Sequence, residues 1–425
     1  MGGGILQLVA YGTQDIFLTG NPQITFFKVV YRRHTNFSME AIQQTYNGTV
    51  TTESSTIIAN IEKNGDLISR IWVDIKLSAS VTANAPHTYM NWTNNTGHAF
   101  IKDCEIRFSG KLIDKQYSQW LDVWNEITDH NDSEWSGLNK HPGKNVYLKS
   151  QTSPPDNLQL MVPLQFWFCR NPGLAIPLIA LQNQNVELQL TTRPVSSLIN
   201  CDQGISLAGD SPPPIILIWV DFIFLDTDER RRFAQVSHEY LIEQVQREVT
   251  SMSTSVNINF AHPVKELVWV IQSASCTNES VTNIDATLNN VSSTISQGND
   301  YFCYLSNSRA GTEIINGVTS YEGFKTMKLM INGNERFAER KASYFRICQP
   351  IQTGFKVPKK HIYMYSYALK PLEHQPSGTC NYSKIDGSKM IFRTDNSYSD
   401  ETLTVYSINY NVLRITSGRG GLAYS

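Results

Sequence analysis

The sequence predicts an all-β protein made of two tandem antiparallel β-sandwich domains with few short helices. Its 425 residues exceed what one hydrophobic core usually supports, so two domains of about 200 residues each are expected. Aromatic residues make up 11% of the chain, with 19 Tyr and 18 Phe, and such side chains favour strands over helices. The third observation is an internal repeat, since the same sequence landmarks occur twice in the same order.

The first repeated landmark is a strand that contains a Trp-Val pair. Residues 67–75 follow an Asn-Gly-Asp turn and contain Trp72. Residues 264–271 follow a His-Pro turn and contain Trp269, which lies 197 positions later (269 − 72). We expect both strands to lie in sandwich cores, where the two tryptophans fill volume.

The landmarks that follow keep the same order. A Ser/Thr/Asn-rich stretch comes after each tryptophan strand, at 78–98 and at 272–323, and we expect both stretches to point outwards. Each stretch leads into a strand with a tight turn, at 104–110 and at 327–333. Two prolines of the first half then recur 199 positions later in the second half: Pro172 and Pro177, then Pro371 and Pro376. Four landmarks in one order indicate a duplicated domain.

Within each half, short strand-like runs alternate with turn signals such as Asn-Gly, Ser-Gly and Pro-Gly. Many short strands in about 200 residues predict a two-sheet antiparallel sandwich. A jelly roll would fit the long polar stretches, but periodicity alone leaves the topology open. Residues 117–128 form a helix candidate, with apolar residues at helical spacing. These residues are Trp120, Leu121, Trp124 and Ile127.

The predicted domain plan has three parts. An N-terminal arm covers residues 1–25, the first sandwich covers 26–226 and the second covers 227–425. The charged stretch at about 226–237 is expected to be a solvated linker or a short helix.

Charge argues against direct contact with nucleic acid. The formal net charge is −2, and the one cluster of basic residues, 230–232, adjoins Asp226, Asp228 and Glu229. Binding to phosphate backbones needs clustered positive charge without such neighbours.

Membrane segments and leaders are not predicted either. The apolar run 215–220 is far shorter than the roughly 20 residues that span a bilayer, and the N-terminus has no signal-peptide pattern. Gly2 invites N-myristoylation, but Leu6 occupies the position where Ser or Thr is preferred.

The sequence offers no pattern for catalysis, metal binding or cofactor binding. The nine histidines form no His-x-His or HExxH pair, as a metalloenzyme on a jelly-roll scaffold would need. No nucleophile elbow, P-loop or dinucleotide fingerprint occurs, and we expect ordinary pKa values for Asp221, Asp226 and Asp228 because of solvent exposure. The seven cysteines are dispersed, which is typical of reduced thiols at an intracellular assembly site. A Cys/His nucleophile stays open, since its members meet in space and not in sequence.

Long segments carry a resemblance to a known family. They include residues 7–12, 18–28, 171–182, 375–381 and 410–415, with Leu-Thr-Gly-Asn-Pro-Gln-Ile-Thr-Phe-Phe-Lys as the most distinctive run. The chain resembles the major capsid protein of nucleocytoplasmic large DNA viruses, of the algal or chlorella-virus type. Only the polar stretches look unlike the family.

The resemblance implies a double jelly roll, that is, two eight-stranded sandwiches side by side. It also implies a homotrimer that forms a pseudo-hexagonal capsomer of an icosahedral shell. The expected partners are neighbouring capsomers and minor capsid proteins, with an internal viral membrane nearby and no direct contact with nucleic acid. The protein would belong to the virion and assemble in the host cell cytoplasm, with no enzymatic activity and no cofactor.

Two sets of site residues follow as expectations. Sequons in the polar stretches make Asn91, Asn94, Asn278 and Asn290 possible glycosylation sites. In the arm, Ile16, Phe17 and Leu18 are the expected assembly contacts, although the arm packing on its own first domain is the alternative.

A second function class also fits a jelly-roll scaffold. Aromatic-rich segments such as residues 89–92 would let a carbohydrate-binding module stack on sugars. Such a module would bind glycans as a monomer, whereas a shell protein would form a stable trimer.

Overall fold

The computed structural model describes most of the chain. The described residues are 3–10, 12–13, 16–78, 81–82, 90–93, 95–128, 157–201, 206–207, 211–273, 301–302, 304, 311–315, 318–394 and 401–424. The chain divides into two compact units, Met1–Phe37 and Ser38–Ser425.

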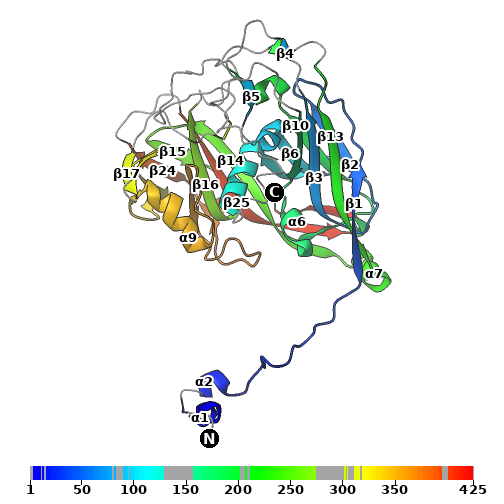
Figure 1. Cartoon of the computed structure of the whole chain (residues 1–425), viewed down its shortest axis with the longest axis vertical. Coiled ribbons are helices and arrows are strands. Elements are labelled where there is room, and N and C mark those ends of the chain that lie inside the picture. The colour runs from blue at the N-terminus through cyan, green and yellow to red at the C-terminus, as the bar shows by residue number, and fades with distance from the viewer. Residues whose placement is uncertain are drawn as a thin grey trace. The chain divides into compact units, whose positions relative to one another are not determined.

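The N-terminal unit contains two short helices, α1 (Gly3–Val9) and α2 (Ile16–Thr19), and then an extended segment without a strand up to residue 36 (Figure 1). Most of its described side chains are apolar yet exposed to solvent.

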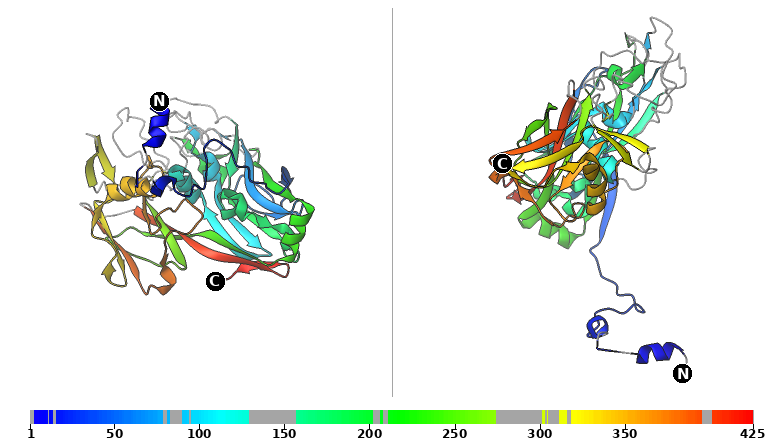
Figure 2. Two further views of the ribbon diagram at one scale, coloured as in Figure 1. Left: turned by 90° about the horizontal axis from the view of Figure 1, so that it is seen from below. Right: turned by 90° about the vertical axis from the view of Figure 1, so that its left-hand side faces the viewer.

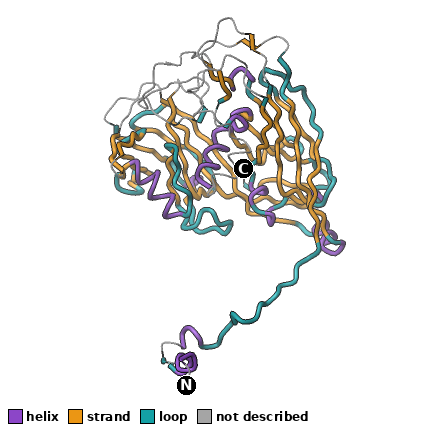
Figure 3. Tube along the Cα trace, viewed as in Figure 1, coloured by secondary structure: helices purple, strands orange, loops and turns teal. Residues whose placement is uncertain are grey.

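Strands dominate the second unit, and they form two sandwiches (Figure 3). The first sheet of the first sandwich has the strand order β1-β13-β3-β8 and the second has β2-β10-β6-β7. Their bounds are β1 (Phe37–Gln44), β2 (Thr56–Ile61), β3 (Leu67–Leu77), β6 (Ile101–Phe108), β7 (Lys111–Tyr117), β8 (Leu158–Pro163), β10 (Val186–Thr192) and β13 (Ile215–Leu225).

The second sandwich repeats this arrangement with the strand orders β14-β25-β16-β22 and β15-β24-β19-β20. Their bounds are β14 (His238–Ser251), β15 (Ser255–Ile258), β16 (Pro263–Ser273), β19 (Thr326–Ile331), β20 (Asn334–Glu335), β22 (Ile362–Ser366), β24 (Ser388–Arg393) and β25 (Glu401–Thr416). Each strand of the first sandwich therefore has a counterpart of the same rank in the second. The predicted duplication and the double jelly roll are confirmed.

Short elements complete the two halves. In the first half they are β4 (Val81–Thr82), β5 (Met90–Trp92), α3 (Thr96–Phe100), α4 (Ser118–Thr128), α6 (Trp167–Arg170), η2 (Pro172–Leu174), β9 (Ile176–Pro177), η3 (Leu178–Ala180), η4 (Val195–Leu198), β11 (Ile199–Cys201) and β12 (Ser206–Leu207). In the second half they are β17 (Gly311–Ile315), β18 (Val318–Glu322), β21 (Arg340–Lys341), η5 (Tyr344–Cys348), α9 (Gln349–Thr353), β23 (Cys380–Asn381), η6 (Tyr382–Lys384) and β26 (Arg419–Leu422).

The tight turn after β6 and the one after β19 have the same backbone form. Ser109 and Gly110 both have positive φ angles, of 45° and 82°, and Asn332 and Gly333 have angles of 47° and 80°. Two successive residues with positive φ are typical of the hairpin turns whose twist matches that of the strands. The Ser-Gly and Asn-Gly pairs therefore place the β6–β7 and β19–β20 hairpins at equivalent positions.

Between the sandwiches the chain forms helix α7 (Thr227–Gln235), which begins at Asp226. The carboxylate of Asp226 accepts a hydrogen bond from the backbone N–H of Thr227, at 2.8 Å. Asp228 and Glu229 lie in the first turn, where negative charge stabilises a helix. None of its residues is buried. The predicted domain limits at 25/26 and 226/227 stay predictions, because the two compact units of the chain meet at Phe37.

The two landmark tryptophans do not share one environment. Trp269 is 0% exposed and packs against Tyr363 and Phe345, with ring centroids 6.0 and 5.3 Å away. Trp72 is only half-buried, because Ile71 and Val73 point into the core and β3 side chains alternate between its faces. The expectation that both tryptophans fill cores is therefore wrong for Trp72.

Parts of the polar stretches also differ from expectation. About half of residues 78–98 and most of residues 272–323 lie outside the described residues, but Trp92, His98 and Phe302 are described and buried. Those side chains pack into the interior, so outward orientation is wrong for these parts of the stretches. The Gly-rich segment at 418–421 contributes to strand β26.

Candidate assembly surfaces

Strands β25, β16 and β22 of the second sandwich are largely buried on both faces. In β22, Tyr363 and Tyr365 belong to the core of the second sandwich, whereas Ile362 and Met364 belong to the larger core that contains the first sandwich. In β16, Val268 belongs to this larger core as well. Alternate side chains thus face different cores, and the outer face of this sheet is covered by the first sandwich.

Helix α4 and strand β7 of the first sandwich provide this cover. The two halves lie side by side (Figures 1 and 2). The rings of Trp120 and Tyr406 are 5.0 Å apart, centroid to centroid. The amide of Gln244 donates to the carbonyl of Ile113 at 2.5 Å. Apolar packing and hydrogen bonds therefore fix one sandwich against the other.

An ion pair reinforces the junction beside α4. The Nζ atom of Lys360 lies 2.7 Å from Asp122, whose side chain is 1% exposed. The hydroxyl of Tyr304 donates to Asp122 at 2.7 Å, and the amide of Asn95 donates to the same carboxylate. Burial by itself raises the pKa of Asp122, but the charge and hydrogen bond of Lys360, together with smaller effects of His98 and Tyr304, outweigh it, so the pKa is lowered.

A second charged cluster lies elsewhere in the junction. Glu243 accepts from Lys265 at 2.6 Å and from Arg170 at 3.3 Å, so that it joins strands β14 and β16 to α6. Glu266 is 0% exposed and neither carboxylate oxygen has a hydrogen-bond partner in the structure. Burial raises the pKa of Glu266 to about 7 and, in β7, that of Asp114 to about 7. The cluster therefore holds carboxyl groups that titrate near neutrality.

The C-terminal hairpin closes the junction at a third place. The backbone N–H of Asn183 donates to the carbonyl of Gly418, at 3.0 Å. A Cβ at Gly420 would lie only 2.9 Å from Leu181 and 3.0 Å from Phe108, so only glycine fits here without a shift. Strand β26 therefore packs closely on the first sandwich.

The equivalent sheet of the first sandwich, β1-β13-β3-β8, is different. Its inner side chains lie in the core, but its outer face carries apolar and aromatic residues in neighbouring rows. Trp219 pairs with Trp72, and Leu217 pairs with Asp74, which pairs in turn with Met161. The exposed or half-buried apolar residues of this outer face are Trp72, Met161, Ile215, Leu217 and Trp219. We call this set the β3 outer face.

The N-terminal unit is the other exposed apolar surface. Phe26 is 87% exposed and Phe27 is 97% exposed, and both lie in a turn of the segment that follows α2. Further exposed apolar residues of this unit are Ile5, Leu6, Leu8, Val9, Leu18, Ile24, Val29, Val30 and Tyr31. Such a density of apolar side chains in water is typical of a segment that contacts another surface.

Comparison with known proteins identifies the family. The family model for the N-terminus of major capsid proteins matches residues 25–226, and the model for large eukaryotic DNA virus major capsid protein matches residues 229–421. The chain belongs to this major capsid protein family.

Curated relatives agree over their whole lengths. The chain is 42% identical to the major capsid protein of Pyramimonas orientalis virus and 38% identical to that of Paramecium bursaria Chlorella virus 1, covering 100% of each chain. Among solved structures, it is similar to a chain of the quasi-atomic model of the PBCV-1 virus capsid, with 32% identity and a TM-score of 0.74. That match covers 94% of this chain and 100% of the other. The predicted resemblance is confirmed.

The predicted site residues are only partly visible. Asn94, Asn278 and Asn290 lie outside the described residues, and Asn91 is described only by its backbone, which pairs with Asn200 in β11. Glycosylation at these positions stays a prediction.

The predicted arm contacts lie in α2, where Leu18 is 85% exposed. The side chains of Ile16 and Phe17 lie outside the described part of the chain. The role of these three residues in assembly stays a prediction.

Other titratable groups can be placed. The pKa of Asp221 is raised by partial burial, so the expectation of an ordinary pKa is wrong there. Four described cysteines are free thiols, and burial raises the pKa of Cys169 to about 12. Within the described ranges, no group of three His, Cys, Asp or Glu residues is placed to hold a metal ion. None of the helices among those residues is long and apolar enough to cross a membrane.

The junction residues were missed by sequence reasoning. The pairs Asp122–Lys360 and Glu243–Arg170 join positions far apart in the chain, and no local pattern marks them. The helical spacing of Trp120 and Trp124 predicted the helix but not its contact, although an apolar helix face of this kind needs a partner surface.

Proposed function

We propose that this chain is a shell-building capsid protein that forms a homotrimeric, pseudo-hexagonal capsomer. The trimer is inferred from a difference between two equivalent sheets of the chain. The outer face of the β16 sheet is covered within the chain, whereas the β3 outer face is left to solvent with Trp72 and Trp219 on it.

The covered sheet indicates what would cover the uncovered one. In the first sandwich, the covering side consists of β7 and α4, which follow the β6 hairpin. The second sandwich has its equivalent side in β20, β21, η5 and α9, which follow β19. On that side Ile351 is 63% exposed and Arg340 is exposed as well. The α9 side of one subunit is therefore the proposed partner of the β3 outer face of the next.

Such a contact is head-to-tail, and a head-to-tail contact closes into a ring when the rotation per step divides the circle. Each subunit supplies two similar sandwiches with one internal junction. Three subunits then give six sandwiches in a ring, with internal and external junctions alternating. Each contact between subunits would then resemble the contact between the two sandwiches within one chain.

The composition of the β3 outer face supports an interface. Tryptophan, methionine and leucine lie in the middle rows, while Arg70 and Lys76 are exposed on the same face. Apolar and aromatic centres with charged rims are typical of specific protein interfaces.

The N-terminal arm has a proposed role of its own. Ile16, Phe17 and Leu18, with the exposed apolar segment that follows, would contact neighbouring capsomers or minor capsid proteins. Packing of the arm on its own first sandwich is the alternative. Deletion of residues 1–25 should leave the trimer intact and weaken contacts between capsomers. Loss of the trimer on deletion would favour a role within the capsomer instead.

The proposed location is the virion shell, assembled in the host cell cytoplasm. The relatives named above are capsid proteins, which supports this location and a structural role without catalysis. A shell that encloses an internal membrane has no need to bind the genome, which agrees with the net charge of −2.

The test is the mass of the purified full-length chain in solution. We expect a species of about 144 kDa, three times 48.0 kDa, at micromolar concentration. Trp219→Lys should shift the population to monomers with unchanged circular dichroism, because it places a charge in the proposed contact. The matched control is Leu369→Lys, in a loop where Leu369 is 80% exposed, and it should stay trimeric. A wild-type monomer that binds sugars would contradict the proposal and favour the carbohydrate-binding alternative.

A further inference from the structure

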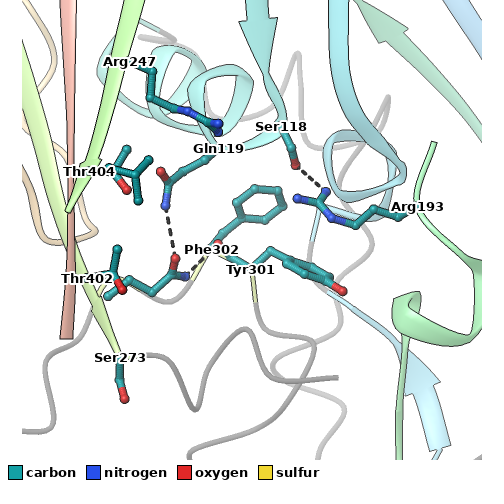
Figure 4. Close-up of a pocket in the computed structure, with 11 residues that line it drawn as sticks. Ser118, Gln119, Arg193, Arg247, Ser273, Tyr301, Phe302, Thr402 and Thr404 are labelled. Carbon is teal, nitrogen blue, oxygen red and sulfur yellow. Dashed lines mark hydrogen bonds between the residues drawn. The ribbon is translucent and has the colours of Figure 1, made fainter. Parts of the chain in front are cut away.

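A cavity of about 200 Å³ lies between the two sandwiches, at the N-terminal end of α4 (Figure 4). Both sandwiches contribute to its wall. Its lining residues are Ser118, Gln119, Arg193, Arg247, Val249, Gln272, Ser273, Tyr301, Phe302, Thr402 and Thr404.

The charge of this wall is one-sided. Arg193 and Arg247 enter from opposite sides in Figure 4, with their guanidinium groups directed inwards, and no Asp or Glu is among the lining residues that the structure describes. Arg193 belongs to the first sandwich and Arg247 to β14 of the second. The cavity therefore combines two fixed positive charges from two domains.

Aromatic rings and hydrogen bonds hold both arginines in position. Arg193 donates to the Ser118 hydroxyl at 2.8 Å, and its guanidinium lies over the ring of Tyr301, 4.3 Å from the centroid. The guanidinium of Arg247 lies over the ring of Tyr117, at 3.7 Å. Stacked guanidinium groups keep their charge and lose little entropy on binding, so the site is pre-organised.

Both arginines act electrostatically on the hydroxyl group of Tyr406. Burial raises the pKa of the Tyr406 hydroxyl, and the positive charges of both Arg247 and Arg193 oppose this rise. Tyr406 in turn donates to Gln119 at 2.8 Å, beside the cavity. The positive potential of both side chains thus reaches the same small region.

The neutral lining groups are hydrogen-bonding groups suited to an anion. Ser118 and Gln119 are the first residues of the 11-residue helix α4, whose N-terminal N–H groups carry partial positive charge. Thr402 and Thr404 supply hydroxyl groups from β25. An amide hydrogen bond from Gln119 to Gln272, at 3.2 Å, links the two sandwiches across this region.

We propose that this cavity binds a small inorganic oxyanion of the phosphate or sulfate class, which bridges the two sandwiches. Guanidinium groups recognise the tetrahedral oxygens of such anions by charge-assisted hydrogen bonds. A neutral sugar would fit a cavity of this size but would not accept charge-assisted hydrogen bonds as an oxyanion does. Arg247 is exposed to solvent, which gives the anion a path into the site.

Binding of the anion would stabilise the junction between the two sandwiches. An anion that binds only the folded chain, with contacts to both domains, raises the stability of the folded state by mass action. This proposal does not depend on trimer formation, because every lining residue belongs to one chain.

The test is isothermal titration calorimetry on the full-length protein in a buffer free of phosphate and sulfate. Sodium phosphate and sodium sulfate are titrated at an ionic strength kept constant with sodium chloride. We expect saturable binding of one ion per chain, and at least about tenfold weaker binding for Arg247→Gln, which loses charge-assisted hydrogen bonds. Arg231→Gln, in the exposed helix α7, is the matched control and should bind like the wild type.

A variant of Arg193 sharpens the test. Arg193→Lys keeps the charge but loses the fork of the guanidinium, so its affinity should lie between those of the wild type and Arg247→Gln. Three results would overturn the proposal: no saturable heat with either anion, equal affinities for Arg247→Gln and Arg231→Gln, or binding of neutral glucose with no effect of the anions. The mass of each variant in solution, measured in parallel, separates a failure of this site from a failure of assembly.

Discussion

Strands β3 and β16 hold the same rank in their sheets, yet their surroundings differ. All residues of β16 after Pro263 are buried, whereas β3 exposes Arg70 and Lys76 and half-buries Trp72. The reason is the neighbour on the outer face, which is the first sandwich for β16 and, within this chain, solvent for β3. The comparison teaches that duplication repeats a strand order, while burial depends on what the next domain covers.

The largest effect is expected at the buried tryptophan. Trp269→Ala should lower the free energy of unfolding by about 3–5 kcal/mol, because it leaves a large cavity between Tyr363 and Phe345. Trp72→Ala should cost less than about 1 kcal/mol in the dissociated chain, since Trp72 is only half-buried there. Urea unfolding followed by circular dichroism measures both values. Equal losses for the two variants would contradict the difference between the sheets.

A smaller effect is expected at the internal junction. Lys360→Met leaves the buried carboxylate of Asp122 without its cation, and should lower the free energy of unfolding by about 2–3 kcal/mol. The exposed Lys389→Met is the matched control and should change little. Lys360 lowers the pKa of Asp122 in the folded chain. The stabilisation by this ion pair is therefore fully present above the pKa that Asp122 has in the unfolded chain, and it is lost as pH falls through its pKa in the folded chain. A loss that is the same at pH 3 and at pH 7 would argue against this ion pair.

The junction also has a pH dependence of opposite sign, which is small per pH unit. The pKa of Glu266 is raised from 4.5 to about 7, mainly by burial, so the folded state holds a proton that the unfolded state has released. Its contribution is fully present below about pH 4.5 and is lost as pH rises to about 7, with a slope of at most about 1.4 kcal/mol per pH unit.

Glu266→Gln keeps the neutral shape and should flatten this part of the stability profile. Unfolding free energies at several pH values between 5 and 8 measure the slope. Glu335→Gln, at an exposed position of β20, is the control and should keep the wild-type profile. An unchanged slope in Glu266→Gln would show that other groups, such as Asp114, carry the dependence.

Sequence reasoning predicted the duplicated sandwiches because their signals are local. Turn residues such as Gly110 and Gly333 and strand runs around Trp72 and Trp269 are visible as patterns. It failed on the burial of Trp72, although the sequence holds a signal for it: Arg70, Asp74 and Lys76 share the face of Trp72, because side chains two positions apart lie on the same face of a strand. The strand around Trp269 has no such polar face next to the tryptophan.

The junction was beyond prediction for a different reason. Its contacts join Gln119 to Tyr406 and Asp122 to Lys360, which are separated by 287 and 238 positions. The oxyanion cavity likewise takes one arginine from each half, and neither Arg193 nor Arg247 stands in a basic cluster of the sequence. Long-range pairs of this kind leave no spacing that a single sequence displays.

The central claim is that a second copy of the chain covers the β3 outer face. Hydroxyl-radical footprinting measures it most directly, by comparing the oxidation of Trp72 and Trp219 in the trimer and in the dissociated chain. We predict that both residues are oxidised in the dissociated chain and protected in the trimer, while Trp269 is protected in both. Equal oxidation of Trp72 and Trp219 in the two forms would contradict the account.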